Sequence, residues 1–262
     1  MVHKYSGTFT VIDGLDGVGK YTVQAAIIKY LSGKKQRILD LHEFWETHDD
    51  HPDFENEFIQ GKKNPLYIDL NSFDVISSSE PTHAGIGKVI RKEITVRNQR
   101  PYSAHLTARL YAADRKVLYQ RVLLPALKAG KHIIQQRSVS TSIVYQPLQK
   151  KLTGEPELTV SKILRIEGND LAMKHCPNLL IIPTIEDMQG LIERLTVREK
   201  QENCEFESLK FQQKIKPLYE SKKLQKTFES RGTKVKYLDA GISVKESKEQ
   251  AVELFKEAFP EI

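Results

Sequence analysis

The chain has few of the features that mark secreted proteins, membrane-spanning proteins or proteins with structural metal sites. Its 262 residues include only two cysteines. Cys176 and Cys204 are far apart and form no C-x-x-C pair, so neither a disulfide nor a zinc framework is expected. The longest apolar runs, such as residues 178–183, are far too short to cross a membrane. The N-terminus shows no apolar signal-peptide core. These absences favour a cytoplasmic protein without a membrane partner.

The charge balance is moderately basic, with 40 Lys and Arg against 34 Asp and Glu and a net charge of +6. This balance permits a polyanionic partner such as nucleic acid. The basic residues are dispersed, however, in pairs such as Lys34-Lys35 and Lys222-Lys223, and no nucleic-acid-binding motif accompanies them. A solvated lysine-rich surface is therefore the favoured interpretation over a nucleic-acid partner.

A glycine-rich stretch near the N-terminus carries the strongest functional signal. Residues 14–20 read Gly-Leu-Asp-Gly-Val-Gly-Lys and match the phosphate-binding pattern G-x-x-x-x-G-K. The β-rich run Thr8–Asp13 precedes them, and apolar residues at helical spacing follow until Gly33. Strand, loop and helix is the order that the motif requires, although a glycine turn without a ligand is the alternative. The pattern ends in Ser or Thr, and here that position is Tyr21.

Such a loop binds phosphate through backbone N–H groups and the free N–H groups of the following helix. Lys20 would reach the β- and γ-phosphates of ATP. The ATP-binding residues expected are Gly14, Leu15, Asp16, Gly17, Val18, Gly19, Lys20, Tyr21 and Thr22.

Strand-like and helical segments alternate along most of the chain. Strands are expected at 8–13, 37–44, 73–77, 132–136, 179–183 and 234–238. Helices are expected at 20–33, 84–95, 104–129, 139–171, 185–199, 206–229 and 244–259. This alternation predicts an α/β fold of the P-loop NTPase type, with a mainly parallel sheet covered by helices on both faces. Ligands should then bind at the carboxyl ends of the strands, where the loops after Asp13, Ser77, Gln136 and Pro183 would meet. The polar stretch 48–71 is expected to be an insertion in a single domain.

Three further segments follow the loop in a specific order. They read Ser-Glu-Pro-Thr-His-Ala-Gly-Ile-Gly-Lys-Val-Ile-Arg at 79–91, Arg-Leu-Tyr-Ala-Ala-Asp-Arg at 109–115, and Gln-Gln-Arg-Ser-Val-Ser-Thr-Ser-Ile-Val-Tyr-Gln at 135–146. Behind such a loop, they resemble the thymidylate kinase family over roughly residues 8–220. The resemblance implies phosphoryl transfer from ATP to dTMP, with Mg²⁺ as cofactor. Members of that family commonly form dimers, so a homodimer is one expectation.

Two residues fit base recognition by their own chemistry. Tyr111 and Arg115 are four apart on an expected helix and share a face, where a ring can stack on a base and a guanidinium can donate to it. A core tyrosine beside a surface arginine is the alternative. The resemblance implies that they stack on thymine and hydrogen-bond its carbonyl.

The resemblance also assigns the rest of the acceptor site. Arg137, at a strand's carboxyl end, would grip the 5′-phosphate, although a structural ion pair is the alternative. Asp16 would accept from the 3′-hydroxyl. Tyr145 would crowd the sugar 2′ carbon, unless it is only a packed aromatic. The full set expected for the acceptor is Asp16, Glu80, Tyr111, Arg115, Arg137, Ser142, Tyr145 and Gln146.

Catalysis is expected from Lys20, Arg137 and a lid arginine that stabilises the transferring phosphoryl group. Position 17 is glycine rather than arginine, so the resemblance places that arginine in a lid at 194–205. Arg198 and Arg194 are its candidates, with a solvated helix face as the alternative.

The chain departs from the family pattern at several positions. Besides Tyr21, Gln136 replaces the aspartate before Arg137, Ser138 replaces the aromatic after it, and Ser79 replaces the arginine before Glu-Pro. Tyr21 cannot ligate Mg²⁺ as Ser or Thr does, so the metal ligands stay unknown, with Asp13, Asp16 and Glu80 as outer-shell candidates. Two alternatives to dTMP phosphorylation follow. One is a kinase for another pyrimidine nucleotide or nucleoside, and the other is a degenerate protein that binds nucleotide without turnover.

Overall fold

A six-stranded sheet forms the centre of the protein in its computed structural model, which describes residues 4–96, 100, 102–149, 156–191 and 209–262. The strand order is β2-β5-β6-β1-β7-β8, and every neighbouring pair is parallel. The strands are β1 (Thr8–Ile12), β2 (Ile38–Asp40), β5 (Val75–Ser79), β6 (His132–Gln136), β7 (Leu179–Thr184) and β8 (Lys234–Asp239). The predicted α/β fold with a parallel sheet is therefore confirmed.

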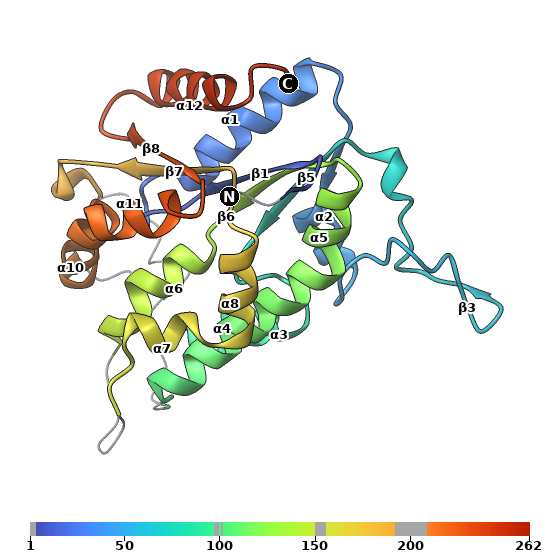
Figure 1. The fold of residues 1–262 in the computed structure, drawn as a ribbon, viewed down its shortest axis with the longest axis horizontal. Helices are drawn as coiled ribbons and strands as arrows, with labels where there is room; N and C mark the ends of the chain where they lie inside the picture. The colour runs from blue at the N-terminus through green and yellow to red at the C-terminus, as the bar shows by residue number, and fades with distance from the viewer. Residues whose placement is uncertain (1–3, 97–99, 101, 150–155, 192–208) are drawn as a thin grey trace.

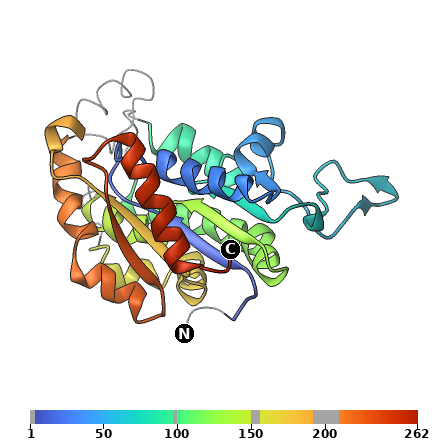
Figure 2. The same cartoon turned by 90° about the horizontal axis from the view of Figure 1, so that it is seen from above.

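Helices cover both faces of this sheet (Figures 1 and 2). One face carries α1 (Lys20–Gly33) and α12 (Val244–Ala258), which pack on each other. The other face carries α4 (Ala104–Leu118), α5 (Leu124–Lys128), α6 (Val139–Tyr145) and α8 (Glu167–Lys174). Helices α10 (Leu209–Tyr219) and α11 (Lys222–Glu229) lie beside α6 and β8. Because both faces are covered, the central strands are continuously apolar, as in Leu179 to Ile182 of β7.

Several helices begin at residues whose side chains cap them. Ser243 and Glu246 form a capping box at the start of α12, and Ser103 accepts from the Leu106 N–H at the start of α4. Helix α1 instead starts at Gly19, whose φ of 88° few other residues adopt. The phosphate loop therefore runs directly into a helix N-terminus with no side-chain cap in the way.

The structure corrects three expected boundaries. The strand expected at 37–44 stops at Asp40, because the Asp40 carboxylate accepts from the His42 N–H and starts α2 (Leu41–Thr47). The single helix expected at 206–229 is two helices among the residues described, because Ser221 caps a new one, α11. The helix expected at 104–129 consists of α4 and α5 with the π-helical turn η3 (Tyr119–Leu123) between them, and Pro125 lies at the start of α5.

Other expected helices are also divided. Residues 84–95 form α3 (Gly85–Val89) and the π-helical turn η2 (Ile90–Ile94). Within 139–171 lie α6, the turn η4 (Gln146–Leu148), α7 (Val160–Leu164) and the start of α8. Most of the helix expected at 185–199 lies outside the described residues, as does the expected lid at 194–205 with Arg194 and Arg198.

The polar stretch after α2 forms an arm that extends away from the sheet (Figures 1 and 2). Its tip is the antiparallel hairpin of β3 (Phe58–Ile59) and β4 (Lys62–Lys63), and the short helix η1 (Leu70–Ser72) follows. The hairpin turns through Gln60 and Gly61, both at positive φ, as a two-residue hairpin turn requires. Among the described residues, no helix is long and apolar enough to cross a membrane.

Candidate active site

A cavity of about 820 Å³ opens at the carboxyl ends of β5, β6 and β1. It combines residues of the phosphate loop with the segments after β5 and β6 and one side of α4. The lining includes Asp16, Lys20, Tyr21, His42, Ser79, Glu80, Arg91, Tyr111, Arg115, Arg137, Ser142, Tyr145 and Gln146. The structure thus brings all eight expected acceptor residues to one cavity together with the loop. Among its described lining residues, none comes from the loop expected after Pro183.

The phosphate loop is held open by its glycines. Gly14, Gly17 and Gly19 all have positive φ, and a Cβ at Gly14 would lie 3.0 Å from the Pro183 carbonyl oxygen. The Lys20 ammonium folds back over the loop and donates to the carbonyl oxygens of Gly14 at 3.2 Å and Leu15 at 2.6 Å. The α1 N-terminus, which has no side-chain cap, is an anion-binding element that such a loop supplies.

Arg137 and Asp16 lie together at the end of the cavity beside the phosphate loop, which we call the phosphate end. The Arg137 guanidinium donates to Asp16, and it lies over the Tyr145 ring with 5.5 Å to the ring centroid. Tyr145 donates its hydroxyl to Asp16 at 3.0 Å. Burial, together with the negative Asp16, raises the pKa of Tyr145 well above its ordinary value, so the phenol stays a donor. Gln212 of α10 completes the set, because its amide donates to Asp16 and accepts from the Asp16 N–H.

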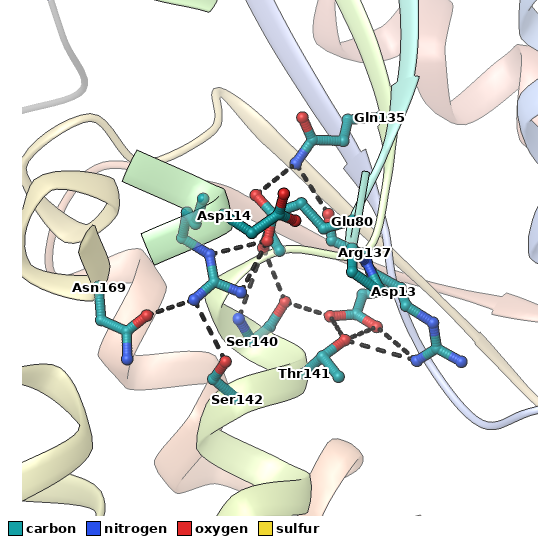
Figure 3. A network of polar contacts seen from close by, with 12 residues as sticks. Asp13, Glu80, Asp114, Gln135, Arg137, Ser140, Thr141, Ser142 and Asn169 are labelled. Carbon is teal, nitrogen blue, oxygen red and sulfur yellow. Dashed lines mark hydrogen bonds and ion pairs between the residues drawn. The ribbon is translucent and has the colours of Figure 1, made fainter. Parts of the chain in front are cut away.

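Asp13 lies behind this pair and is fully buried. Its carboxylate accepts from the Gly14 N–H and from the hydroxyls of Ser140 and Thr141 at the start of α6, as Figure 3 shows for the two hydroxyls. Tyr219 donates to it as well, at 2.9 Å. These bonds tie the strand that enters the phosphate loop to the helix that follows Arg137, which fixes the position of Arg137 relative to the loop.

Arg115 and Glu80 form the other end of the cavity. Arg115 is 1% exposed, and its Nε and Nη2 lie 2.7 Å from Glu80 Oε2. Its Nη1 donates to Ser142 at 3.2 Å and to Asn169 (Figure 3). Among the contacts of the described residues, these use four of the five guanidinium N–H groups.

A glycine allows Asn169 to reach Arg115. A Cβ at Gly168 would lie 1.7 Å from the Ala112 carbonyl oxygen, so α8 approaches α4 this closely only with glycine there. Burial raises the pKa of Glu80 to about 7, although the facing Arg115 lowers it. Gln135 joins the two ends of the cavity, since its amide donates to Glu80 at 3.1 Å and to the Arg137 carbonyl at 2.9 Å.

The residues that depart from the family pattern have structural partners of their own. Gln136 donates to Gln24 of α1, and Gln24 in turn donates to the carbonyls of Ser78 and Ile134. Ser138 caps α6 by accepting from the Ser140 N–H. Tyr21 is 72% exposed at the cavity's edge.

These residues do not form a direct ligand set for Mg²⁺. Both Asp13 oxygens are occupied by hydrogen bonds, and Tyr21 and Gln136 offer no carboxylate or short hydroxyl. Within the described part of the chain, no group of three His, Cys, Asp or Glu side chains could hold a metal ion. The ligands that remain for Mg²⁺ are phosphate oxygens and water, which this ion commonly keeps.

Several residues that position the side chains of this site are not recognisable in the sequence. Gln135, Asn169 and Gln212 are fully buried polar side chains with no recognisable motif spacing. Ser140 and Thr141 carried one signal, because hydroxyl residues directly after a strand-end arginine fit a helix start. His42 was also missed, since the strand expected at 37–44 gave it no place beside the cavity.

The fold and the site together define a class of protein. A parallel sheet, a glycine loop leading into a helix, and a cavity with arginines at both ends are the parts of a P-loop nucleotide kinase.

Comparison with known proteins narrows the class. The family model for thymidylate kinase matches residues 66–251. Thymidylate kinase of Lactobacillus delbrueckii subsp. bulgaricus is 26% identical over 98% of this chain and 99% of its own length. That of Maridesulfovibrio salexigens is 33% identical over 61% of this chain and 73% of its own length. A solved thymidylate kinase from Candida albicans shares the fold, with a TM-score of 0.62, 18% identity, and coverage of 96% of this chain and 92% of its own. The chain belongs to the thymidylate kinase family.

Proposed function

We propose that this enzyme transfers the γ-phosphoryl group of ATP to dTMP, giving dTDP and ADP. Membership of the family supports this activity. The observation that carries it is the single cavity that holds the phosphate loop and Arg137 at one end and Tyr111 and Arg115 at the other. A nucleoside monophosphate has the same order of groups, with a phosphate at one end and a base at the other.

At the phosphate end, we expect the substrate phosphates to replace the present partners of Lys20 and Arg137. Lys20 leaves the loop carbonyls for the β- and γ-phosphates of ATP, and Mg²⁺ accompanies ATP. Arg137 leaves Asp16 for the 5′-phosphate of dTMP and holds it in line with the γ-phosphate. Asp16 then accepts from the 3′-hydroxyl. Positioning and charge neutralisation supply most of the rate enhancement, as expected for phosphoryl transfer.

The base end supports selection of a pyrimidine. The Tyr111 ring stacks on the base, and the remaining N–H of Arg115 donates to a base carbonyl. Ser142, Gln146 and Tyr145 line the same cavity, and we expect the Tyr145 ring to crowd a ribose 2′-hydroxyl. Assembly into a homodimer stays a prediction.

A coupled ADP-release assay tests the proposal. It compares dTMP, dUMP, dCMP, UMP and AMP as acceptors, with and without Mg²⁺. We expect the highest kcat/KM with dTMP, and little turnover with AMP. Absence of turnover with every acceptor, despite measurable ATP binding, would contradict kinase activity. A preference for AMP would contradict the roles given to Tyr111 and Arg115.

A further inference from the structure

A chain of hydrogen bonds lines the β5 side of the cavity. His42 of α2 contacts Asp40 Oδ1 through Nδ1 at 3.0 Å and Ser79 Oγ through Nε2 at 2.8 Å. Because a carboxylate can only accept, Nδ1 is the donor to Asp40, and Nε2 can either accept from the Ser79 hydroxyl or donate to it. Both His42 and Ser79 line the cavity. The array joins three segments of the chain that are distant in sequence.

Ser79 lies close to the phosphate end. It pairs in register with Gln136, the residue before Arg137, so only one strand spacing of about 4.8 Å separates the two backbones. A phosphate held by Arg137 at the carboxyl end of β6 therefore has Ser79 on its β5 side. No element of the phosphate loop occupies that side of the cavity wall, among the residues described.

The charges at the phosphate loop are already balanced before an acceptor arrives. Lys20 lies 3.5 Å from Asp16, and Arg137 pairs with Asp16 and lies 3.8 Å from Asp13. Two cations thus face two carboxylates. A phosphate monoester dianion entering this site adds two negative charges, and Arg91, which donates to Ser79, can offset only one of them.

We propose that His42 takes up a proton when the acceptor phosphate binds. Ser79 lies between the two groups, accepting a hydrogen bond from His42 and donating one to the phosphate. The proton comes from solvent and binds Nε2. Nε2–H then donates to Ser79 Oγ, which frees the Ser79 hydroxyl proton to donate to a phosphate oxygen. The Nδ1–H bond to Asp40 is kept throughout. This inference rests on the proposed phosphorylation of dTMP and names a positioning residue for it.

The groups around His42 fit this role. Asp40 stabilises the imidazolium, and burial of Asp40 is outweighed by the contact with His42, so the pKa of Asp40 is lowered. The His83 ring lies 5.5 Å from that of His42, and Trp45 lies 5.8 Å from it. Loss of water contact, together with Arg91 and His42, lowers the pKa of His83 to about 4, so His83 stays neutral near neutral pH.

Arg91 is a further charged group near this array. It donates to Ser79 Oγ at 3.4 Å and to the Pro81 carbonyl at 2.6 Å. Its charge opposes protonation of His42 in the absence of an anion and favours the same anion that His42 would bind. Protonation of His42 is therefore coupled to occupancy of the site.

Calorimetry of dTMP binding in two buffers of different ionisation enthalpy measures the proton uptake directly. At about pH 7.5 dTMP is already a dianion, so the protons counted belong to the protein. We expect net uptake by the unsubstituted enzyme and loss of that uptake in His42→Gln. In kinetics, KM for dTMP should rise roughly tenfold in His42→Gln at pH values near 6.5, with kcat and KM for ATP changed much less.

A permanent positive charge at position 79 should restore dTMP binding in the His42→Gln variant. In the double variant His42→Gln with Ser79→Arg, KM for dTMP should return toward the original value and lose its pH dependence. His132→Gln is the matched control, because His132 also bonds a hydroxyl, that of Thr8 at 2.9 Å, but lies at the opposite end of β6. It should leave proton uptake unchanged.

Three outcomes would overturn the inference. One is dTMP turnover with unchanged proton uptake in His42→Gln, which leaves the proposed function intact. The second is a phosphate ester on Ser79 found by mass spectrometry after turnover, which would make the hydroxyl a nucleophile instead. The third is an unsubstituted enzyme that neither binds nor phosphorylates dTMP, which removes the proposed function as well.

Discussion

The two ends of the cavity each contain an arginine beside a carboxylate, but the two pairs differ in how firmly they are held. Arg115 is 1% exposed, and Glu80, Ser142 and Asn169 surround its guanidinium. The Arg137 side chain is 19% exposed, and its contacts are with Asp16, Asp13 and the ring of Tyr145. Both pairs line the same cavity, but the first is more completely buried than the second.

This difference indicates what each arginine can do. A buried ion pair with satisfied hydrogen bonds is costly to separate, so we expect Arg115 to keep a fixed position. The Arg137–Asp16 pair is less buried, so it is the pair better able to exchange its carboxylate for a phosphate. In the proposed function, recognition of the base would depend on a fixed Arg115, and binding of the acceptor phosphate on a change of partner by Arg137.

The largest effect that tests this comparison is expected from Arg137→Ala. The enzyme should lose on the order of a thousandfold in kcat/KM for dTMP, because the bidentate contact with the acceptor phosphate disappears. KM for ATP should change only a few-fold, and the unfolding free energy should fall little. Steady-state kinetics and urea unfolding measure these quantities. Arg121→Ala is a control, since Arg121 pairs with Asp50 at the base of the arm. Equal losses for both substrates would contradict the assignment.

The next effect is on stability and comes from removing the carboxylate at each end. Glu80→Ala leaves Arg115 buried without its counter-ion and should cost about 3 to 5 kcal/mol of unfolding free energy. Asp16→Ala also removes an acceptor from several donors, but Arg137 is 19% exposed, so the cost should be smaller, about 1 to 3 kcal/mol, while activity falls. Urea unfolding of the two variants gives the comparison. Similar losses of stability in both would show that the two pairs are equally structural.

The fold could be predicted from the sequence because it depends on local signals. Buried strands, helical spacing and glycines identified the parallel sheet, and the strand His132–Gln136 was predicted with its observed bounds. Short polar signals were harder to recognise, since Asp40 and Ser221 start helices inside runs that looked continuous.

The candidate site could be predicted only where a motif marks it. The loop, Glu80, Tyr111, Arg115, Arg137 and Tyr145 came from such motifs, and the structure places them around one cavity. The residues that orient them could not be predicted, because their partners are distant in sequence. Asn169 is 54 residues from Arg115, and Gln212 is 196 residues from Asp16. Contacts of this kind leave no periodicity or spacing in the chain.

The smallest effect concerns Gln136, which lies beside Arg137 and departs from the family's aspartate. Gln24 uses its amide N–H groups on the carbonyls of Ser78 and Ile134, so its oxygen faces Gln136 and requires a donor there. Gln136→Asp removes that donor and sets a carboxylate against the Gln24 oxygen, which should cost about 1 to 2 kcal/mol of unfolding free energy. Gln136→Glu keeps the side-chain length and should show a similar loss, which separates charge from shape. Thermal unfolding and the Mg²⁺ dependence of turnover are the measurements. The contradicting outcome is a Gln136→Asp variant with unchanged stability and a higher apparent affinity for Mg²⁺. Position 136 would then take part in metal binding instead of holding Arg137 in place.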